Sequence, residues 1–407
     1  MINHKIKNVV PNLLSFFTGS GGLDLGFESA GFTVLGCLEL EAWATSTLRK
    51  NFPNRKVIGP PDLSGDIREY TAADILSKLG VGKDDIDIMV GGPPCQPFSQ
   101  AAAQRFLSTD RRFKRKGFED EEKGTLLHEY VRLIIELKPR NFVIENVPGL
   151  LTIDDGRQLK SALNLLATEA GYSFTELVTT RMENYGVPQF RERLIIWGSR
   201  LNTKCTLPPP VLVKNGKMSP GYLSSAQALL SINSSLPNHE PRKHMKSSIN
   251  RYKKLSFGQR EKLGRVDRLN PFLPSKTVIA GGMNGGGRSH LHPFLARTLT
   301  VRECARLQTY PDSYIFNGTM SRQFTQVGNS VPPLYAAHLA AHILAIEYDY
   351  KVDHTKFQQI ISPYLLDSRS IHEAVDRLYE ESRQLNADLM YDDISCEEQL
   401  NLELIAA

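Results

Sequence analysis

Cysteine is scarce in this chain of 407 residues, which has five, at positions 37, 95, 205, 304 and 396. Their odd number, wide spacing and lack of any Cys-x-x-Cys pair argue against both a disulfide framework and a zinc site. No apolar run is long enough to cross a bilayer, and the first ten residues, MINHKIKNVV, lack the apolar core of a signal peptide. We therefore expect a soluble protein of a reducing cytoplasm, with no bound metal and no membrane partner.

A complete dinucleotide-binding fingerprint is also missing. The segment 12–31 reads as an apolar strand, a turn with glycines at 19, 21, 22 and 26, and a helix start. Asp24 stands where the third glycine of Gly-x-Gly-x-x-Gly would be, which argues against a nicotinamide oxidoreductase. A glycine turn still lets a cofactor approach the backbone closely. Glu39 follows a second short apolar run, where an acid that holds ribose hydroxyls lies in such folds.

One cysteine lies in the stiffest loop of the sequence, GGPPCQPFSQ at 91–100. The apolar run 86–90 predicts a buried strand, and the two glycines after it allow a sharp exit. Three prolines then fix φ on both sides of Cys95 and remove backbone donors, so that the loop cannot relax into a helix. A thiol presented in this way is a candidate nucleophile.

Basic residues gather in one region of the chain. Residues 199–290 contain 16 Lys and Arg against three acids, or +13, although the whole chain carries only +5. Residues 351–407 contain five basic and 12 acidic residues, or −7, so the remainder is close to neutral. A second patch, 105–116, has six basic residues against Asp110. Such local excess is typical of a nucleic-acid footprint, and we expect the loop 105–116 to close over DNA.

Alternating strands and amphipathic helices predict a doubly wound α/β sheet. The strands are expected at 13–18, 33–38, 86–91, 141–146 and 194–198, and an apolar stripe at 126–135 predicts a helix that ends before Lys138-Pro139. Segment 199–290 lacks this alternation and reads as a small irregular domain, because an unstructured linker of this length is improbable. Helices are expected again at 301–307 and 332–346, and one or two more in 351–407.

Together these segments resemble the cytosine-C5 DNA methyltransferases of bacterial modification systems, over roughly residues 12–345. Phe17 to Gly22 resembles the methyl-donor loop of the family, and Gly92-Pro93-Pro94-Cys95-Gln96 matches its nucleophile motif. The remaining matches are Glu39, Asp66-Ile67, Glu145-Asn146-Val147, the Gln-x-Arg-x-Arg motif at 189–193, RTLTVRECARLQTYPD, and QVGNSVPP at 326–333. One departure is Ser15, where the family usually has Asp, and it leaves the support of the donor loop in question.

The resemblance assigns roles to individual residues. The implied catalytic residues are Cys95, Gln96, Glu145, Arg191 and Arg193. The implied S-adenosylmethionine site comprises Phe17, Gly19, Gly21, Gly22, Leu23, Glu39, Leu40, Asp66, Ile67, Pro94, Leu126, Asn329 and Ser330. The implied DNA contacts are Ser99, Arg111, Arg112, Gln189, Arg251, Lys253, Lys254, Thr277, Gly281 and Gly282. Double-stranded DNA is the expected partner, together with a cognate restriction endonuclease, and the protein is expected to be a monomer.

The chemistry of cytosine explains why these residue types occur together. C5 is a poor nucleophile until a thiolate adds at C6, which is the role expected of Cys95. Glu145 would stabilise charge at N3, and burial against apolar neighbours would raise its pKa and favour the protonated form. Arg191 and Arg193 alternate on one expected strand and would share a face, where they could hold the base O2 and a phosphate.

The expected organisation has four parts. They are a catalytic and donor-binding domain at 1–198, a target-recognition domain at 199–290, a return segment at 291–350 that completes the catalytic domain, and an acidic extension at 351–407. Three alternatives remain open at this point: a transfer-RNA methyltransferase of the same chemistry, a DNA-binding protein with a dead site, and a nicotinamide oxidoreductase. The second would need a lost Cys95 or Glu145, and both are present.

Overall fold

The computed structural model of the protein describes residues 6–7, 10–94, 126–201, 203–211, 213–214, 217–218, 222–230, 232–263, 266–280, 290–350 and 377. Seven residues with an expected role lie outside this description, namely Cys95, Gln96, Ser99, Arg111, Arg112, Gly281 and Gly282. The chain forms two compact units. The first contains Met1–Arg181, Glu192–Pro209 and Ala336–Asp353, and the second contains Met182–Arg191, Pro210–Tyr335 and His354–Ala407.

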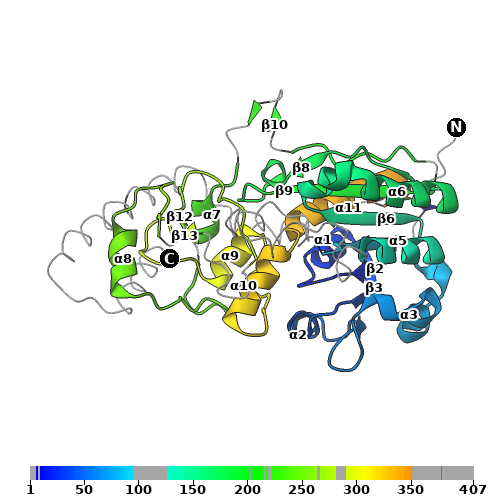
Figure 1. The fold of residues 1–407 in the computed structure, drawn as a ribbon, viewed down its shortest axis with the longest axis horizontal. Coiled ribbons are helices and arrows are strands. Elements are labelled where there is room, and N and C mark those ends of the chain that lie inside the picture. The colour runs from blue at the N-terminus through cyan, green and yellow to red at the C-terminus, as the bar shows by residue number, and fades with distance from the viewer. Residues whose placement is uncertain are drawn as a thin grey trace. The chain divides into compact units, whose positions relative to one another are not determined.

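A mixed sheet forms the centre of the first unit (Figure 1). The strand order is β4-β3-β2-β5-β6-β9-β7, and β8 also pairs with β9. The bounds are β2 Asn12–Phe16, β3 Thr33–Leu38, β4 Val57–Ile58, β5 Ile88–Gly91, β6 Asn141–Asn146, β7 Ser173–Phe174, β8 Thr179–Arg181 and β9 Glu192–Ser199. Strands β2 to β6 are parallel, whereas β9 runs antiparallel to β6, β7 and β8. Since the order reverses between β2 and β5, the predicted doubly wound α/β fold is confirmed.

Side chains alternate between the two faces of this sheet. Leu14, Met89, Phe142, Ile144 and Ile196 belong to one apolar cluster, which also contains residues of α3 (Ala72–Leu79), α5 (Leu126–Leu137) and α6 (Arg157–Ala170). Figure 1 shows α5 and α6 beside β6. The intervening residues of the strands are buried as well, and Trp197 of β9 packs edge-on against His342 of α11 (Pro333–Glu347). Both faces are therefore covered, as expected for a mostly parallel sheet.

The remaining elements of the first unit follow local signals. Helix α1 (Gly22–Ala30) starts after Gly21, whose φ of 72° is available to glycine at little cost. Helix α2 (Ala42–Asn51) leads to β4, and a capping box between Thr71 and Asp74 starts α3. Two residues each form β1 (Ile6–Lys7) and β14 (Tyr348–Asp349), which pair in parallel. The helix expected before Lys138-Pro139 is α5, and no end of the five expected strands differs from the observed end by more than two residues.

The second unit contains shorter elements joined by long connections. Its helices are α7 Ser225–Leu229, α8 Lys246–Lys253, α9 Val301–Leu307 and α10 Met320–Asn329, and its two-residue strands are β10 Val213–Lys214, β11 Lys217–Met218, β12 Asp267–Arg268 and β13 His290–Leu291. The irregular character expected for 199–290 is evident here. The expected return segment is divided, because 291–335 belongs to the second unit and only the part from Ala336 onward belongs to the first.

No helix among the described residues is long and apolar enough to cross a membrane.

Candidate active site

Glu145 and Arg193 meet at the carboxyl end of β6. Glu145 lies on the β6 face opposite Phe142 and Ile144, and Arg193 lies diagonally across on the antiparallel neighbour β9. Arg193 Nε is 3.0 Å from Glu145 Oε1, and the two side chains are 14% and 11% exposed. A carboxylate and a guanidinium so far removed from solvent form a charge-assisted contact that water screens little.

The loop that leads to Cys95 starts next to this pair. Strand β5 ends at Gly91, and a Cβ added to Gly92 would lie 2.9 Å from Glu145 Oε2. Any larger residue at 92 would push the carboxylate away, so glycine is needed there for the close approach. Asn146 fixes the next residue, because its Nδ2 donates to the Pro93 carbonyl at 3.2 Å while its Oδ1 accepts from the Val147 amide at 2.9 Å. The start of the cysteine loop is therefore bonded to β6.

The glycine turn after β2, which is the expected methyl-donor loop, is held by Glu39. Oε2 of Glu39 accepts from the Gly19 amide at 2.6 Å, and Oε1 accepts from the Glu41 amide at 2.8 Å. Burial raises the pKa of this carboxyl, although the two amide hydrogen bonds oppose the shift. A Cβ at Gly19 would meet no atom within 4 Å, so there is open space beside the loop. The backbone of Glu39 is in turn packed tightly, since a Cβ at Gly59 or Gly65 would lie within 2.2 Å of its carbonyl oxygen.

Ser15 supports the loop from below, at the position where the sequence departs from the family. Its Oγ lies 2.9 Å from Thr18 Oγ1, and Ser15 is 1% exposed. Asp24 of α1 is fully buried nearby, where Arg55 Nη1 is 3.3 Å from its Oδ2 and the Ser15 hydroxyl lowers its pKa. Burial outweighs these effects and raises the pKa of Asp24 to about 6. A buried acidic side chain, Asp24 of α1, therefore interacts with Ser15 of β2 beneath the glycine turn.

Other expected donor residues lie around the same edge of the sheet. The Asp66 carboxylate accepts from Arg68 Nε at 2.9 Å and from the Arg68 amide at 3.0 Å, and these hydrogen bonds lower its pKa. Ile67 is buried, Leu126 starts α5, and the Phe17 ring packs edge-on against Tyr130. Leu40, in contrast, is 52% exposed, which leaves an apolar side chain facing solvent directly after Glu39.

Arg191 does not share a strand face with Arg193, contrary to the expectation from the sequence. Strand β9 starts at Glu192, and Arg191 belongs to the second unit, where it is 1% exposed. Its guanidinium donates to the carbonyls of Val278, Gly328 and Ser330 at 3.2, 3.0 and 2.9 Å. A guanidinium whose two terminal nitrogens bond to three backbone carbonyls holds together segments that lie 87 to 139 positions away.

Gln189 and Thr277, two expected DNA contacts, take part in the same packing. Gln189 is fully buried, its Oε1 accepts from the Val278 amide at 2.8 Å, and its Nε2 donates to the Leu307 carbonyl at 3.2 Å. Thr277 Oγ1 donates to the Phe190 carbonyl at 2.6 Å. These hydrogen bonds join 189–191 to 277–278 and to the end of α9. They explain physically why the second unit extends beyond the expected domain bounds.

The end of α10 packs against the same segment. A Cβ at Gly328 would lie 2.2 Å from the Ala280 amide nitrogen, so helix and segment touch backbone to backbone. Ser330 is 8% exposed, and its Oγ lies 2.6 Å from Tyr310 Oη. Asn329 is exposed. Both expected donor contacts therefore belong to the second unit.

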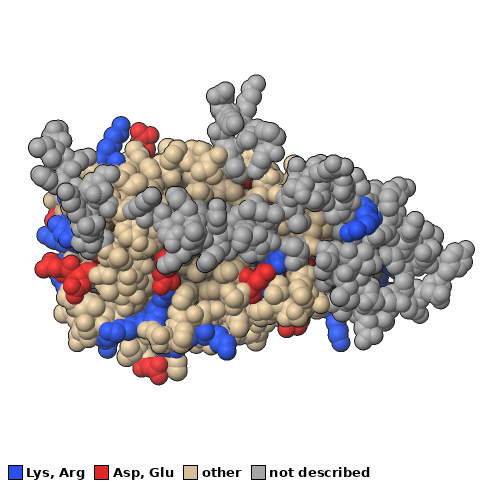
Figure 2. All heavy atoms as spheres, turned by 180° about the vertical axis from the view of Figure 1, so that it is seen from behind, with Lys and Arg blue, Asp and Glu red and all other residues tan. Residues whose placement is uncertain are grey.

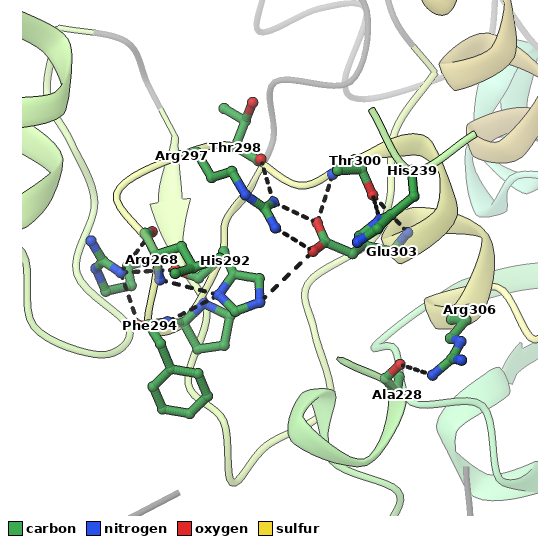
Figure 3. A network of polar contacts seen from close by, with 12 residues as sticks. Ala228, His239, Arg268, His292, Phe294, Arg297, Thr298, Thr300, Glu303 and Arg306 are labelled. Carbon is green, nitrogen blue, oxygen red and sulfur yellow. Dashed lines mark hydrogen bonds and ion pairs between the residues drawn. The ribbon is translucent and has the colours of Figure 1, made fainter. Parts of the chain in front are cut away.

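Buried arginines hold much of the second unit together (Figure 3). Arg297 forms two bonds of 2.9 and 2.8 Å to Glu303 of α9, whose Oε2 also accepts from the Thr300 amide at 2.6 Å. Burial opposes ionisation of Glu303, but the charge and hydrogen bonds of Arg297 outweigh it and hold its pKa well below the usual range. Arg268 donates to the carbonyls of His292, Pro293 and Tyr252 at 2.8, 2.8 and 2.6 Å. An interior built on such contacts can order a segment that has few regular elements.

Several of the basic residues counted in 199–290 are neutralised internally. Arg251 pairs with Glu261 at 3.0 Å, and Asp267 pairs with Arg260 at 3.3 Å and with Lys276 at 3.0 Å. Burial lowers the pKa of Lys253, whereas Lys254 is exposed. On the face drawn in Figure 2, described basic and acidic side chains are interspersed. These ion pairs leave the net +13 unchanged, because Glu261 and Asp267 are already counted in it, but they show which of the cations are engaged within the segment. Among the described residues, no His, Cys, Asp or Glu group is arranged to hold a metal ion.

Sequence reasoning overlooked two residues that position the site. Asn146 was part of a matched motif but received no role, although an amide directly after Glu145 on a strand end is a signal for a loop anchor. Asp24 was interpreted only as a missing glycine. Its pairing with Arg55, 31 residues away, has no local signal.

Comparison with known proteins agrees with this geometry. The sequence profile described as C-5 cytosine-specific DNA methylase matches residues 12–345. The type II methyltransferase M.NgoFVII of Neisseria gonorrhoeae is 33% identical over 375 residues, covering 86% of this chain and 92% of that protein. M.XorII of Xanthomonas oryzae pv. oryzae, also named a type II methyltransferase, is 30% identical and covers 81% and 84%.

A solved structure shows the same likeness. The crystal structure of a prophage-encoded E. coli protein assigned as a DNA modification methyltransferase superposes with a TM-score of 0.66 at 25% identity, covering 83% of this chain and 99% of that one. The glycine turn, the Glu145–Arg193 pair and the Gly-Pro-Pro-Cys loop are thus found within a profile match over most of the chain. The chain belongs to the C-5 cytosine-specific DNA methylase family and is a DNA cytosine-5-methyltransferase.

Proposed function

We propose that the protein transfers a methyl group from S-adenosylmethionine to C5 of a flipped-out cytosine in a specific double-stranded DNA sequence, through a covalent bond between Cys95 and C6. One observation carries the proposal. Glu145 and Arg193 meet at the carboxyl end of β6, and Gly92 approaches Glu145 there. Gly92 precedes Cys95 by three residues in a loop stiffened by proline. Extrusion of the base is required because C5 and C6 cannot be reached within a stacked duplex.

The protein residues would act on the base as follows. The Cys95 thiolate donates an electron pair to C6, and the C5=C6 electrons become available at C5 as charge moves toward N3. Glu145 shares a proton with N3 and stabilises that charge. S-adenosylmethionine supplies an electrophilic methyl group, and its demethylated product is S-adenosylhomocysteine. A base then takes the C5 proton, the C5=C6 bond re-forms, and the C6–S bond breaks to return the thiolate.

Arg193 would prepare Glu145 for this role. Without DNA, the guanidinium neutralises the carboxylate at 3.0 Å, so that the charge is not left unpaired in a partly buried site. When a cytosine enters, Glu145 would take up a proton from solvent and donate it in a hydrogen bond to N3, and Arg193 could donate to the neighbouring O2. We assign Arg191 and Gln189 a different part, which is to hold segment 275–278 in place, because their donors already serve backbone carbonyls.

The donor-loop residues fit S-adenosylmethionine. The open space beside Gly19 allows a ligand to approach the backbone, and the Glu39 carboxylate has lone pairs left for ribose hydroxyls after accepting two amides. Phe17 and Leu40 would offer apolar surface around the same strand ends and Asp66 an acceptor, whereas Ile67 and Leu126 are buried and would support that surface from within the core. The contributions of Gly21, Gly22, Leu23, Pro94, Asn329 and Ser330 to donor binding stay predictions.

The wider setting is part of the same proposal. Both relatives are named type II methyltransferases, which supports a role in protecting host DNA from a cognate restriction endonuclease. We propose a monomeric enzyme of the bacterial cytoplasm that needs no metal. Segment 199–290 would recognise the DNA target, with 1–198 and 291–350 providing catalysis. Ser99, Arg111, Arg112, Gly281 and Gly282 would touch the DNA.

Trapping on a 5-fluorocytosine duplex tests the proposal. Fluorine at C5 cannot leave as a proton does, so wild type should form a covalent complex that survives denaturing electrophoresis. Cys95→Ser should form none and should lose methyl transfer, while still binding duplex and donor. Cys205→Ser serves as a matched control, since Cys205 is half-buried in the first unit. Methylation by Cys95→Ser at a near wild-type rate would show that another group is the nucleophile.

A further inference from the structure

Two apolar side chains of the second unit are unusually exposed. Met245 and Leu263 are each 76% exposed, whereas the next large apolar side chain among the described residues, Val211, is 53% exposed. Single exposed apolar residues need no explanation. Here, however, the two most exposed large apolar side chains among the described residues belong to one short segment, 241–263. Met245 directly precedes helix α8, and Leu263 follows it in the sequence.

All exposed charges of that segment are positive. Residues 241–263 contain eight Lys and Arg and a single acid, Glu261. Glu261 is 5% exposed, and its Oε1 accepts from Arg251 Nε at 3.0 Å. Lys243, Lys254 and Lys262, in contrast, are exposed. Residues 241–263 therefore expose lysines and two apolar side chains, while the one carboxylate of the segment, Glu261, is buried.

The backbone that carries the two side chains is firmly held. Met245 caps the start of α8, and its carbonyl accepts from the Ser248 and Ile249 amides at 2.8 and 3.1 Å. Tyr252, on the inner face of the helix, packs with Val266 and Leu291. The turn that ends in Leu263 is tied down through Glu261, whose amide donates to the Val266 carbonyl at 2.7 Å. Arg251, the partner of Glu261, follows Met245 by six residues, about 9 Å along a helix axis.

We propose that Met245 and Leu263 make apolar contacts with base edges of double-stranded DNA, on a surface whose lysines hold the phosphates. This inference rests on the proposed function and names side chains that read the sequence. Apolar side chains discriminate bases by packing on the thymine methyl group or by entering between base steps, and lysine supplies the flanking phosphate contact. A protein partner fits less well, because interfaces between proteins are depleted in lysine and centre on larger apolar patches.

The test starts from the methylated sequence itself, which bisulfite sequencing of plasmid DNA from expressing cells identifies. Affinities of the purified enzyme are then measured for a duplex with that sequence and for a scrambled duplex, over a range of salt concentrations. The variants are the double substitution Met245→Ala with Leu263→Ala, and the triple substitution Lys243→Ala, Lys254→Ala and Lys262→Ala. Val178→Ala is the matched control, since Val178 is 48% exposed and belongs to the first unit.

The double variant should bind its own sequence about ten-fold more weakly and the scrambled duplex almost unchanged, with an unaltered salt slope. Its KM for DNA should rise while its KM for the donor stays the same. The lysine variant should instead lose affinity for both duplexes, and its salt slope should fall by about one unit per lost phosphate contact.

Two results would overturn the inference. One is wild-type discrimination between the two duplexes by the double variant. The other is a sedimentation coefficient of the double variant that differs from that of the wild type in the absence of DNA. Such a difference would mean that this surface binds a second copy of the chain. A wild-type enzyme that methylates no DNA would refute the proposed function as a whole, whereas an active wild type with an unaffected double variant refutes this inference alone.

Discussion

The Glu145 carboxylate has a guanidinium on one side and a glycine on the other. Arg193 is 3.0 Å from Oε1, and the absence of a side chain at Gly92 leaves room for Oε2. Both contacts keep the carboxylate at the end of β6, where a base entering beside the cysteine loop would meet it. The position of this acid thus depends on residues of two neighbouring strands.

Glu145→Gln should retain the size of this side chain and its place beside Arg193, but it removes the group that can share a proton with N3. The single-turnover methylation rate on saturating duplex should fall by roughly 10²- to 10⁴-fold, the range typical of a lost acid or base. Glu176→Gln, at an exposed site of the same unit, should leave the rate unchanged. An unchanged rate in Glu145→Gln would reduce Glu145 to a scaffold role.

Asp24 predicts a pH dependence of stability. Burial raises its pKa in the folded protein to about 6 from an ordinary value of 3.8. Between these two values the folded state binds more protons than the unfolded state, so this group lowers stability as pH rises from about 4 to 6, and its effect is constant above that. A shift of about two units corresponds to roughly 3 kcal/mol of unfolding free energy.

Asp24→Asn removes this titration while keeping the shape of the side chain. The unfolding free energy of wild type minus that of the variant should therefore decrease between pH 4.5 and 6.5, measured by urea denaturation. Asp62→Asn, the same substitution at an exposed position of the same unit, is measured beside it. Parallel curves for Asp24→Asn would mean that the ion pair with Arg55 keeps Asp24 ionised throughout.

At the scale of elements, the Asn146 side chain at the end of β6 bonds to the segment that follows β5. Asn146 uses both ends of its amide, donating to the Pro93 carbonyl and accepting from the Val147 amide. The cysteine loop therefore leaves the sheet from a fixed point. Three prolines alone stiffen a loop but do not determine where it starts.

Asn146→Asp should keep the acceptor toward Val147 and place a carboxylate oxygen against the Pro93 carbonyl. The lost hydrogen bond and the repulsion should cost about 1–3 kcal/mol locally, and the methylation rate should fall about ten-fold or more. Donor binding, followed by calorimetry, should not change, because Gly19 and Glu39 lie in the connections that follow other strands, β2 and β3. Equal losses of donor affinity and rate would indicate general unfolding of the sheet edge and would contradict the anchor.

At the scale of the whole molecule, the two compact units do not follow the bounds that composition suggests. Gln189, Phe190 and Arg191 bond to Ser275, Thr277 and Val278, so a segment before the basic region is part of the same unit. Helices α9 and α10, which follow the basic region, belong to it too. The segment proposed to recognise DNA is therefore folded together with the residues that precede and follow it.

A graft tests this division. Replacing only 199–290 with the segment of a relative of different specificity should leave Gln189 and Arg191 facing foreign partners, and the product should unfold at a lower temperature than either parent. A graft of 182–191 together with 210–335 should preserve these contacts. The enzyme should then methylate the target sequence of the relative from which the graft was taken. Bisulfite sequencing and thermal unfolding are the measurements. An active second graft that still methylates the original sequence would place specificity in 105–116.

The sequence by itself determined the sheet, the family and the residue types of the site. Strand periodicity, the glycine turn and the Gly-Pro-Pro-Cys loop are local patterns, since each depends on neighbours a few positions away. The excess of basic residues in 199–290 can likewise be counted from the sequence alone. This is why the doubly wound fold could be predicted before any coordinates.

Only the tertiary structure decided how individual polar groups are used. Arg191 and Arg193 look equivalent in the sequence, yet one is buried against carbonyls up to 139 positions away and the other faces Glu145. Asp24 and Asn146 depend likewise on partners 31 and 53 positions away. The physical reason is that a hydrogen bond or ion pair requires an atom at about 3 Å, and long-range folding alone brings that atom there.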